Sequence, residues 1–309
     1  MILTVTLNPA VDKTLLIPEF TIDAVNRVQQ VILDPGGKGI NVSKSVQALG
    51  GDTMCFGVLG GETGTYILNA LKDMGIKQDM VFVQTPTRTN TKIVDLVRGT
   101  NTDVNEAGSA VSEAALREVK QKLLSAAKPG DTVVIAGKNP PNTPDDLLAV
   151  WTRELKAAGL RVCLDTVGRP MQLAIFEGPF AIKPNREELA ELVGRELETD
   201  QEVIGAAKDL LQNGIELVCV SLGGDGAIFV TADETVRTVC PKVCVVSTVG
   251  AGDSMMAALA YAVQCGCSLQ QIAQRATATA TATVQIRGSQ PAPLELVKEM
   301  MASVRVEHI

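Results

Sequence analysis

Short apolar runs alternate with amphipathic stretches along most of the chain. Runs typical of β-strands cover Ile2–Leu7, Thr53–Val58, Thr132–Ala136, Val162–Asp165, Phe180–Lys183 and Leu217–Ser221. Stretches with the spacing of a helix face cover Ile40–Leu49, Tyr66–Met74, Ala114–Ala127, Asp145–Ala158 and Gln201–Asn213. Short β-branched runs that alternate with helices are typical of βαβ units, in which helices cover both faces of a parallel sheet. The pattern therefore predicts an α/β fold with a mostly parallel sheet.

Two stretches depart from this alternation. Asp12–Leu33 and Arg88–Val97 look like polar-alternating strands without intervening helices, a pattern common in a small antiparallel flap beside a parallel sheet. No linker rich in Pro, Gly or Ser divides the chain, so residues 1–309 are predicted to form one domain with lid strands from about 12–33 and 88–105. Residues 276–284 alternate Ala and Thr, and we expect a helix there because Ala is the best helix former.

Composition and charge narrow the class of protein. The 309 residues carry a net charge of −7, which argues against a nucleic-acid partner because phosphates attract clustered positive charge. The single histidine, His308, lies beside the last residue, which argues against Ser-His-Asp or Cys-His catalysis and His-based metal sites. No apolar run reaches the ~18 residues of a membrane helix. Seven cysteines without a CxxC pair predict buried, reduced thiols in a cytoplasmic protein.

The segment Ser247–Ser254, Ser-Thr-Val-Gly-Ala-Gly-Asp-Ser, precedes an apolar helix at Met255–Val263. Glycines let the backbone approach a ligand closely, and the free N–H groups at a helix start bind anions. Asp253 beside such an anion hole can accept a proton from an attacking hydroxyl, as a phosphoryl transfer requires. The alternative is a glycine-rich turn in which Asp253 is an ordinary first-turn carboxylate.

Two more glycine-rich segments are candidates for ligand contact. Asp34–Val42, Asp-Pro-Gly-Gly-Lys-Gly-Ile-Asn-Val, opens a helix but matches neither the GxGxxG nor the Walker A pattern. Either its backbone and Asn41 pack against polyhydroxyl groups while Lys38 meets a phosphate, or it is only a tight strand-to-helix turn. Ser221–Gly226 ends a strand, and it either cradles nucleotide phosphates or forms a hairpin turn.

The segment Ile182–Glu188 places oxygen ligands at the start of a predicted helix. Asn185 and Glu188 are three residues apart, so both side chains can face one site. Oxygen ligands there suit Mg²⁺ that is held partly through water. The alternative is a capped helix with a solvated acidic face.

These four segments, in their order along the chain, resemble the PfkB (ribokinase-like) carbohydrate kinase family. The resemblance runs from Met1 to about Arg287, and Ser247–Ser254 is its most specific part. Leu7–Asp12, Val25–Val28, Gly36–Val42 and Thr87–Asn90 look like its hexose-phosphate branch, which contains 1-phosphofructokinase, tagatose-6-phosphate kinase and the minor 6-phosphofructokinase. Lys38 favours the first two, because the third typically has glycine there.

The resemblance implies a three-layer α/β/α fold with a β-flap lid. It also implies ATP-dependent and Mg²⁺-dependent phosphorylation of a ketohexose monophosphate to a bisphosphate, with fructose 1-phosphate as the first expected substrate and tagatose 6-phosphate as the second. A homodimer is expected because the flap in this family often pairs with that of a second subunit. Some members bind a monovalent cation near the segment that matches Ser247 and Val249.

The resemblance further implies roles for single residues. Asp253 would be the base, and the anion hole would be formed by Gly250, Ala251 and Gly252. The sugar phosphate would be held by Asp12, Gly37, Lys38, Gly39, Asn41 and Arg88, and by Arg27, which would act across a dimer interface. ATP would lie against Lys183, Asn185, Ser221, Gly223, Gly226 and Thr248. Glu188, with Asn185, would act on Mg²⁺ and its waters.

The chain departs from the branch after the strand Thr132–Ile135. The branch usually has Ser-Gly-Ser, an apolar residue and Pro there, and this chain has Ala136-Gly137-Lys138-Asn139-Pro140. That position lies near the substrate in the family, so Lys138 adds a charge where a small hydroxyl is usual. Either Lys138 reads the phosphate of the acceptor, or it points to solvent.

Three other functions compete with this interpretation. A kinase of an unphosphorylated sugar or nucleoside would face a neutral ligand with three cations, Lys38, Arg88 and Lys138. A non-catalytic sugar-phosphate sensor would have no need of Asp253 as a base. A dinucleotide-dependent dehydrogenase would need a GxGxxG segment after the first strand, which this chain lacks.

Overall fold

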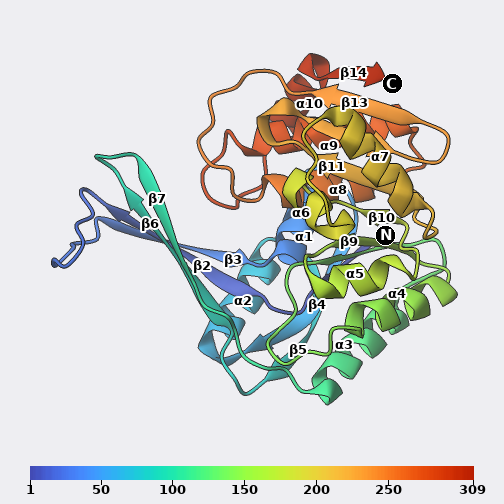
Figure 1. The fold of residues 1–309 in the computed structure, drawn as a ribbon. Coiled ribbons are helices and arrows are strands. Elements are labelled where there is room, and N and C mark those ends of the chain that lie inside the picture. The colour runs from blue at the N-terminus through green and yellow to red at the C-terminus, as the bar shows by residue number, and fades with distance from the viewer.

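The computed structural model describes residues 1–309. Its main sheet has ten strands in the order β14-β13-β12-β11-β10-β9-β8-β1-β4-β5, and every pairing from β11 to β5 is parallel. These strands are β1 (Ile2–Thr6), β4 (Thr53–Gly60), β5 (Lys77–Val83), β8 (Thr132–Ala136), β9 (Arg161–Asp165), β10 (Ala181–Ile182), β11 (Leu217–Ser221), β12 (Ala227–Val230), β13 (Thr235–Val239) and β14 (Arg305–His308). The predicted α/β fold with a mostly parallel sheet is confirmed (Figure 1).

Helices cover both faces of this sheet (Figure 1). One face carries α3 (Glu113–Ala126), α4 (Leu147–Ala157), α5 (Arg169–Ile175), α6 (Arg186–Val193) and α7 (Asp200–Leu211). The other carries α1 (Lys38–Ala48), α2 (Gly61–Asp73), α8 (Ala251–Gln264), α9 (Leu269–Thr283) and α10 (Leu294–Ser303). Successive side chains of a strand point to opposite faces, so Leu3 and Val5 enter the first core and Ile2 enters the second. The molecule therefore has three layers.

The alternating Ala-Thr stretch at 276–284 is helical up to Thr283, as predicted. Its hydroxyls are satisfied by carbonyls one turn earlier: Thr279 Oγ1 donates to Arg275 O, Thr281 Oγ1 to Thr277 O and Thr283 Oγ1 to Thr279 O. Because these bonds hold the threonine side chains against the helix, a strand-like alternation is compatible with helical backbone.

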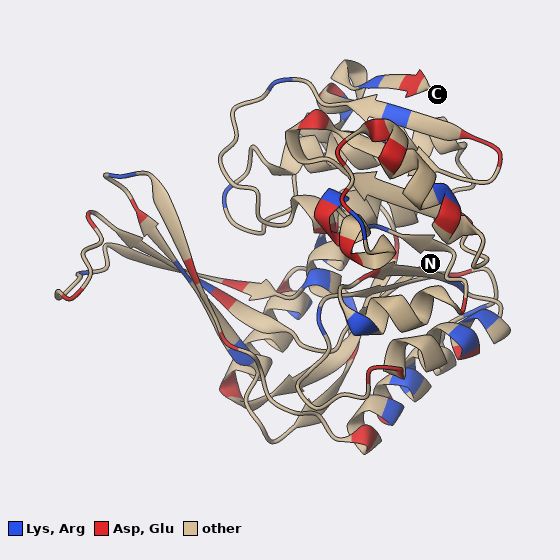
Figure 2. Ribbon diagram, viewed as in Figure 1, with Lys and Arg blue, Asp and Glu red and all other residues tan.

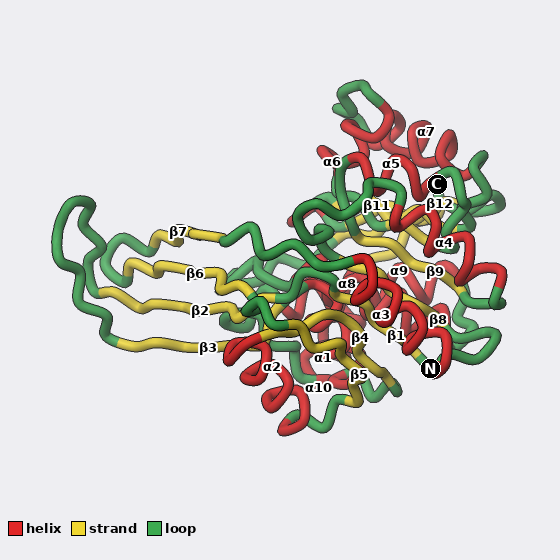
Figure 3. Tube along the Cα trace, turned by 90° about the horizontal axis from the view of Figure 1, so that it is seen from below, coloured by secondary structure: helices red, strands yellow, loops and turns green.

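A second sheet projects from the body of the molecule (Figures 1 and 3). We call it the flap sheet; its strands are β2 (Ala10–Ile17), β3 (Gln30–Gly36), β6 (Arg88–Asp95) and β7 (Thr100–Asn105), in the order β3-β2-β6-β7. The expectation of an antiparallel flap is wrong at its centre, where β2 and β6 pair in parallel. The two strands are separated along the chain by β3, α1, β4, α2 and β5, and so long a connection lets the second strand run in the direction of the first.

The cysteines depart from the prediction of buried thiols. Cys55, Cys163 and Cys219 are buried, whereas Cys244 and Cys265 are exposed, because Cys244 lies in the loop before α8 and Cys265 in the turn after it, both outside the sheet. Acidic and basic segments alternate along α3 and α4 (Figure 2). None of the helices is long and apolar enough to cross a membrane.

Candidate active site

The predicted base lies where two helices begin, at the carboxyl edge of the main sheet. Asp253 is in the first turn of α8 and is 7% exposed. Asn41, in the first turn of α1, donates from Nδ2 to Asp253 Oδ2 at 2.9 Å. Ser45 lies one turn after Asn41, and Ser254 directly follows Asp253; their hydroxyls are 3.0 Å apart and link the same two helices. The starts of α1 and α8 are therefore fixed against each other around the Asp253 carboxylate.

The start of α8 has the features of an anion site. Gly250 precedes the helix with a φ of 77°, a backbone conformation that side chains rarely adopt. The first N–H groups of a helix have no partner within it and carry partial positive charge. A Cβ atom placed on Gly252 would lie only 3.3 Å from Lys183 Nζ. A helix N-terminus and a lysine ammonium thus converge on one point.

A second carboxylate group, Asp165, connects the two lysines of the site. It ends β9 and is 1% exposed. Lys38 Nζ lies 3.0 Å from its Oδ1, and Lys183 Nζ lies 3.2 Å from its Oδ2. Burial by itself would raise the pKa of Asp165, but the charges of Lys183 and Lys38 outweigh this effect and hold the pKa below its ordinary value. Asp165 is therefore a fixed negative charge between two cations.

The same surroundings act on Asp253 in the opposite direction. Burial and the negative charge of Asp165 raise the pKa of Asp253 to about 6, although the Asn41 hydrogen bond and Lys38 oppose the shift. A carboxyl group with this pKa is ionised at neutral pH and binds a proton more readily than an ordinary aspartate. This is the property that a general base requires.

Asp12 and Arg88 form a second cluster at the root of the flap sheet. Asn90 joins them: its Nδ2 donates to Asp12 Oδ1 at 3.1 Å, and Arg88 Nη1 donates to its Oδ1 at 3.2 Å. Arg88 also donates to the carbonyls of Glu106 and Asn8, at 2.7 and 3.2 Å. Burial raises the pKa of Asp12, and the hydrogen bond from Asn90 opposes it.

Gly36, Gly37 and Gly39 connect this cluster to the base. A side chain on Gly36 would overlap the Asp12 carboxylate, and Gly37 precedes the first residue of α1. A Cβ atom on Gly39 would lie 2.5 Å from Val5 O, so only glycine lets α1 start this close to β1. This turn therefore brings Asp12, Lys38 and Asn41 to one edge of the sheet.

The remaining predicted nucleotide residues lie further along that edge. Asn185 and Glu188 form a capping box at the start of α6, in which each side chain accepts from the backbone N–H of the other. Ser221 pairs with Asn185 through an isolated bridge. The Gly223–Gly226 turn joins β11 to the antiparallel strand β12, so it has the connectivity of a hairpin. Both are geometries that the sequence left open as alternatives.

Three residues that were predicted to belong to the site do not lie in these clusters. Arg27 is exposed and belongs to the loop between β2 and β3. This loop lies at the end of the flap sheet that is far from the body of the molecule (Figure 1). Lys138 is exposed, although the preceding Gly137 packs beside Lys38. Thr248 is exposed, and its carbonyl accepts a hydrogen bond from Ala251 N at 3.4 Å.

Sequence analysis missed Asp165 and Asn90 as members of the site. A signal for Asp165 was present: it is the last residue of a predicted parallel strand, and ligands in such sheets bind at the carboxyl ends of strands. Asn90 follows Arg88 by two positions, so both side chains lie on one face of β6.

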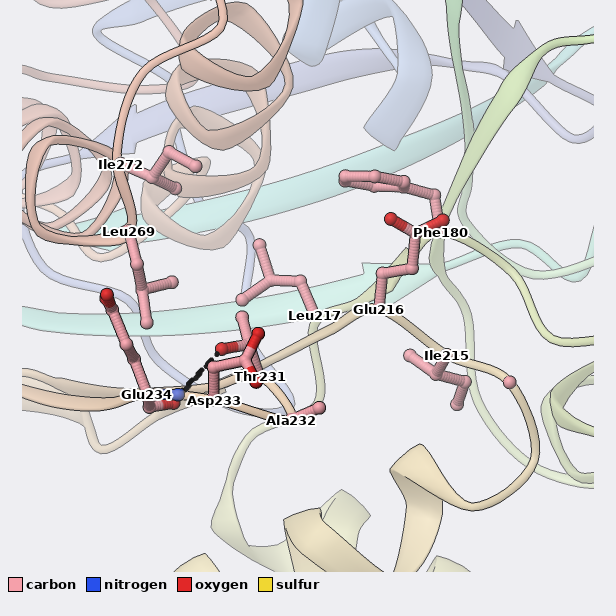
Figure 4. A pocket seen from close by; sticks show the side chains of 11 residues that line it. Phe180, Ile215, Glu216, Leu217, Thr231, Ala232, Asp233, Glu234, Leu269 and Ile272 are labelled. Carbon is pink, nitrogen blue, oxygen red and sulfur yellow. Dashed lines mark hydrogen bonds between the residues drawn. The ribbon is translucent and has the colours of Figure 1, made fainter.

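A hollow in the surface with a volume of about 550 Å³ lies elsewhere (Figure 4). It lies where β11 begins, at the opposite edge of the sheet, between Phe180, Leu217, Ile272 and the turn Thr231–Glu234. None of the predicted site residues lines it.

Comparison with known proteins places this geometry in a family. The sequence model of the family described as "pfkB family carbohydrate kinase" matches residues 5–295. The 1-phosphofructokinase of Borreliella burgdorferi is 34% identical over 100% of this chain and 99% of its own length. That of Rhodobacter capsulatus is 36% identical over 99% of this chain and 97% of its own length.

Solved structures of related proteins have the same fold as this chain. Phosphofructokinase-2 from Escherichia coli in complex with fructose-6-phosphate covers 98% of both chains with a TM-score of 0.93 at 28% identity. The same enzyme in complex with potassium covers 98% of both chains with a TM-score of 0.94 at 29% identity. The chain belongs to the pfkB family of carbohydrate kinases and has the fold that the family resemblance implied.

Proposed function

We propose that the protein is a 1-phosphofructokinase, which transfers the γ-phosphoryl group of ATP to fructose 1-phosphate and produces fructose 1,6-bisphosphate. The observation that carries the proposal is the buried Asp253 carboxylate at the start of α8, beside Lys183 and the Lys38–Asp165 pair. The similarity to 1-phosphofructokinases over nearly the whole chain supports the choice of substrate.

In this proposal Asp253 accepts the proton of the attacking sugar hydroxyl. The hydroxyl oxygen forms a bond to the γ-phosphorus, the bond to the leaving oxygen of ADP breaks, and the electron pair of that bond stays on ADP. The N–H groups of Gly250, Ala251 and Gly252, together with Lys183, stabilise the charge on the transferred group. The protein contributes positioning and electrostatic stabilisation, as phosphoryl transfer requires.

The sugar phosphate would lie between the two clusters. Asp12 and Asn41 are placed to hold its hydroxyls, beside the backbone of Gly37 and Gly39. The cations Arg88 and Lys38 would bind its phosphate. The support is electrostatic: Arg88 forms its three hydrogen bonds with neutral oxygens, and although Asp12 and Glu106 are near enough to act on its charge, neither forms an ion pair with it. A guanidinium in this state suits a phosphate.

ATP would lie along Lys183, Asn185, Ser221, Thr248 and the Gly223–Gly226 turn. Asn185 Oδ1 already accepts a hydrogen bond from Glu188 N, whereas the second carboxylate oxygen of Glu188 takes no part in the capping box. The chain has no group of three or more metal-binding side chains. These residues fit Mg²⁺ held by phosphates and waters, with Glu188 contacting the waters, because Mg²⁺ usually keeps several waters in nucleotide sites. A monovalent cation near Ser247 and Val249 is part of the same proposal, supported by the potassium complex of the relative.

The proposed reaction is tested by ADP release from MgATP with a panel of acceptors. Fructose 1-phosphate should be the best substrate, ahead of tagatose 6-phosphate, fructose 6-phosphate and free fructose. Asp253→Asn should lower kcat by about 10²–10⁴-fold, the usual contribution of a general base. The exposed Asp73→Asn serves as the matched control and should leave kcat unchanged. Turnover of free sugars alone would contradict the phosphate assignment, and binding without turnover would favour a sensor.

The departure at Lys138 predicts a specific effect on the acceptor. If Lys138 reads the acceptor phosphate, Lys138→Ser should raise KM for fructose 1-phosphate by about 10- to 100-fold, the worth of one charge-assisted hydrogen bond, and leave KM for MgATP unchanged. Lys128→Ser is the matched control, because Lys128 is an exposed loop lysine near the other end of β8. An unchanged ranking of phosphorylated and free sugars in Lys138→Ser would refute this role.

We also propose that the protein is a homodimer through the flap sheet. Apolar side chains are exposed there, including Ile22 and Val25, at 84% and 87%, and Val31, Leu33 and Val104 on the strands. Exposed apolar patches of this kind are typical of interfaces. Arg27 lies in the same loop as Ile22 and Val25, so in a dimer it would serve the site of the partner subunit.

The dimer is tested by light scattering during size exclusion. The wild-type protein should elute with twice the mass of one chain, and Val25→Asp should elute as a monomer, because burying an unpaired carboxylate in the interface is costly. Phe176→Asp, which alters an exposed residue of the body at 73%, should remain dimeric. A monomeric wild-type protein, or a dimeric Val25→Asp variant, would overturn the proposal.

A further inference from the structure

Lys44 is a buried lysine to which the proposed reaction gives no role. It lies on α1, one turn after Asn41, and is 3% exposed. Its Nζ donates to Pro35 O at 3.1 Å and to Ser289 Oγ at 3.3 Å. Pro35 belongs to the end of β3, and Ser289 lies in the loop that follows α9. The ammonium group therefore bridges two segments that are far apart in the sequence.

The neighbouring residue of β3, Asp34, is held by the same loop. Gln290 Nε2 donates to Asp34 Oδ1, and a Cβ atom on Gly288 would lie 3.4 Å from Asp34 Oδ2. We refer to Asp34, Lys44, Ser289 and Gln290 together as the β3 latch. Through these contacts the latch joins the root of the flap sheet to the end of α9.

A like-charge pair explains why a latch is needed at this point. Asp34 is the direct cross-strand partner of Asp12, and side chains opposite each other in an antiparallel pair lie on the same face. Two carboxylates in this arrangement repel each other, and the charge of Asp34 contributes to the raised pKa of Asp12. The hydrogen bond from Gln290 and the nearby charge of Lys44 compensate Asp34. Asp12 accepts a hydrogen bond from Asn90 and lies near the charges of Lys44 and Arg88.

The Lys44 ammonium group interacts electrostatically with the carboxylates of three aspartates and forms an ion pair with none of them. Burial lowers the pKa of Lys44, and the charges of Asp34, Asp12 and Asp253 oppose that shift. Its two hydrogen-bond partners are neutral oxygens. Removing the side chain would therefore free both tethered segments and change the potential at Asp12 and Asp253 together.

We propose that the β3 latch is a positioning device for the sugar phosphate: it fixes the end of β3, and through it the Gly36–Gly37 turn and Asp12, in the geometry that binds the acceptor. This inference rests on the proposed kinase function and adds Lys44, Ser289 and Gln290 to it as positioning residues. The latch forms no hydrogen bond with Lys183 or with the capping box of α6, whereas Asp34 pairs directly with Asp12. The backbone of Ser289 also lies beside the anion hole, since a Cβ atom on Gly250 would be 3.8 Å from Ser289 Cα. Substitutions of the latch side chains leave this backbone contact in place, so their effect is expected on the acceptor.

Gln290→Leu and Ser289→Ala test the latch while they leave the charge of Lys44 in place. Each should raise KM for fructose 1-phosphate by about 2- to 10-fold, the range that corresponds to one ordinary hydrogen bond, with kcat and KM for MgATP unchanged. Gln285→Leu is the matched control: Gln285 donates to Thr281 O in the same region and does not contact β3. An unchanged KM for the acceptor in both variants, or an equal rise in KM for MgATP, would overturn the proposal.

A second measurement separates the latch from the kinase activity. In the ligand-free protein, Lys44→Met should accelerate amide hydrogen exchange at residues 30–37 and 285–290, and not in β8 or β9. In a double-mutant cycle on the acceptor KM, Lys44→Met and Gln290→Leu should cost less together than the sum of their separate effects. Exchange that is unchanged in Lys44→Met would refute the latch. A wild-type protein without turnover on any ketohexose phosphate would instead refute the proposed function, whatever the exchange result.

Discussion

The candidate site depends on one carboxylate that two lysines share. Asp165 is buried at the end of β9, and Lys38 and Lys183 approach its two oxygens from different segments. Lys183 and Asp165 are both buried, and breaking a buried pair by removing one partner costs about 3–5 kcal/mol. The Lys38 side chain is 40% exposed, so its pair with Asp165 contributes less. Because Lys183 cannot leave Asp165 cheaply, its ammonium group stays beside the start of α8, where the proposed reaction develops negative charge.

The fold supplies the precision that this arrangement needs. Parallel strands end at one edge of the sheet, so β9 and β10 deliver Asp165 and Lys183 as neighbours. The glycine at position 39 lets α1 start against β1, which carries Asn41 to Asp253. The β3 latch would fix the root of the flap sheet in the same way, so that Asp12 would be held in place as firmly as Asp253.

The sequence predicted the alternation of strands and helices well, because hydrophobic periodicity is a local property. The strand Thr132–Ala136 and the helical Ala-Thr stretch are examples. The parallel pairing of β2 with β6 could not be predicted in this way, because it depends on a long connection. Asp253 and Asn41 were found from glycine-rich motifs. Asp165 and Asn90 were missed although their places at a strand end and beside Arg88 were readable, because neither belongs to a glycine-rich segment. Lys44 acts through Pro35 and Ser289, and a local pattern gives no signal for its contact with Ser289. The capping box of Asn185 and Glu188 was an open alternative that only side-chain geometry could test.

The central claim is that the buried surroundings of Asp253 tune it to accept a proton near neutral pH. The claim is tested directly by a ¹³C NMR titration of aspartate carboxyl carbons in the ligand-free protein, with the Asp253→Asn variant used to assign the resonance. Burial and Asp165 favour the protonated form, so Asp253 should be protonated below and ionised above a midpoint near pH 6. A midpoint near the ordinary aspartate value of about 4 would contradict the account.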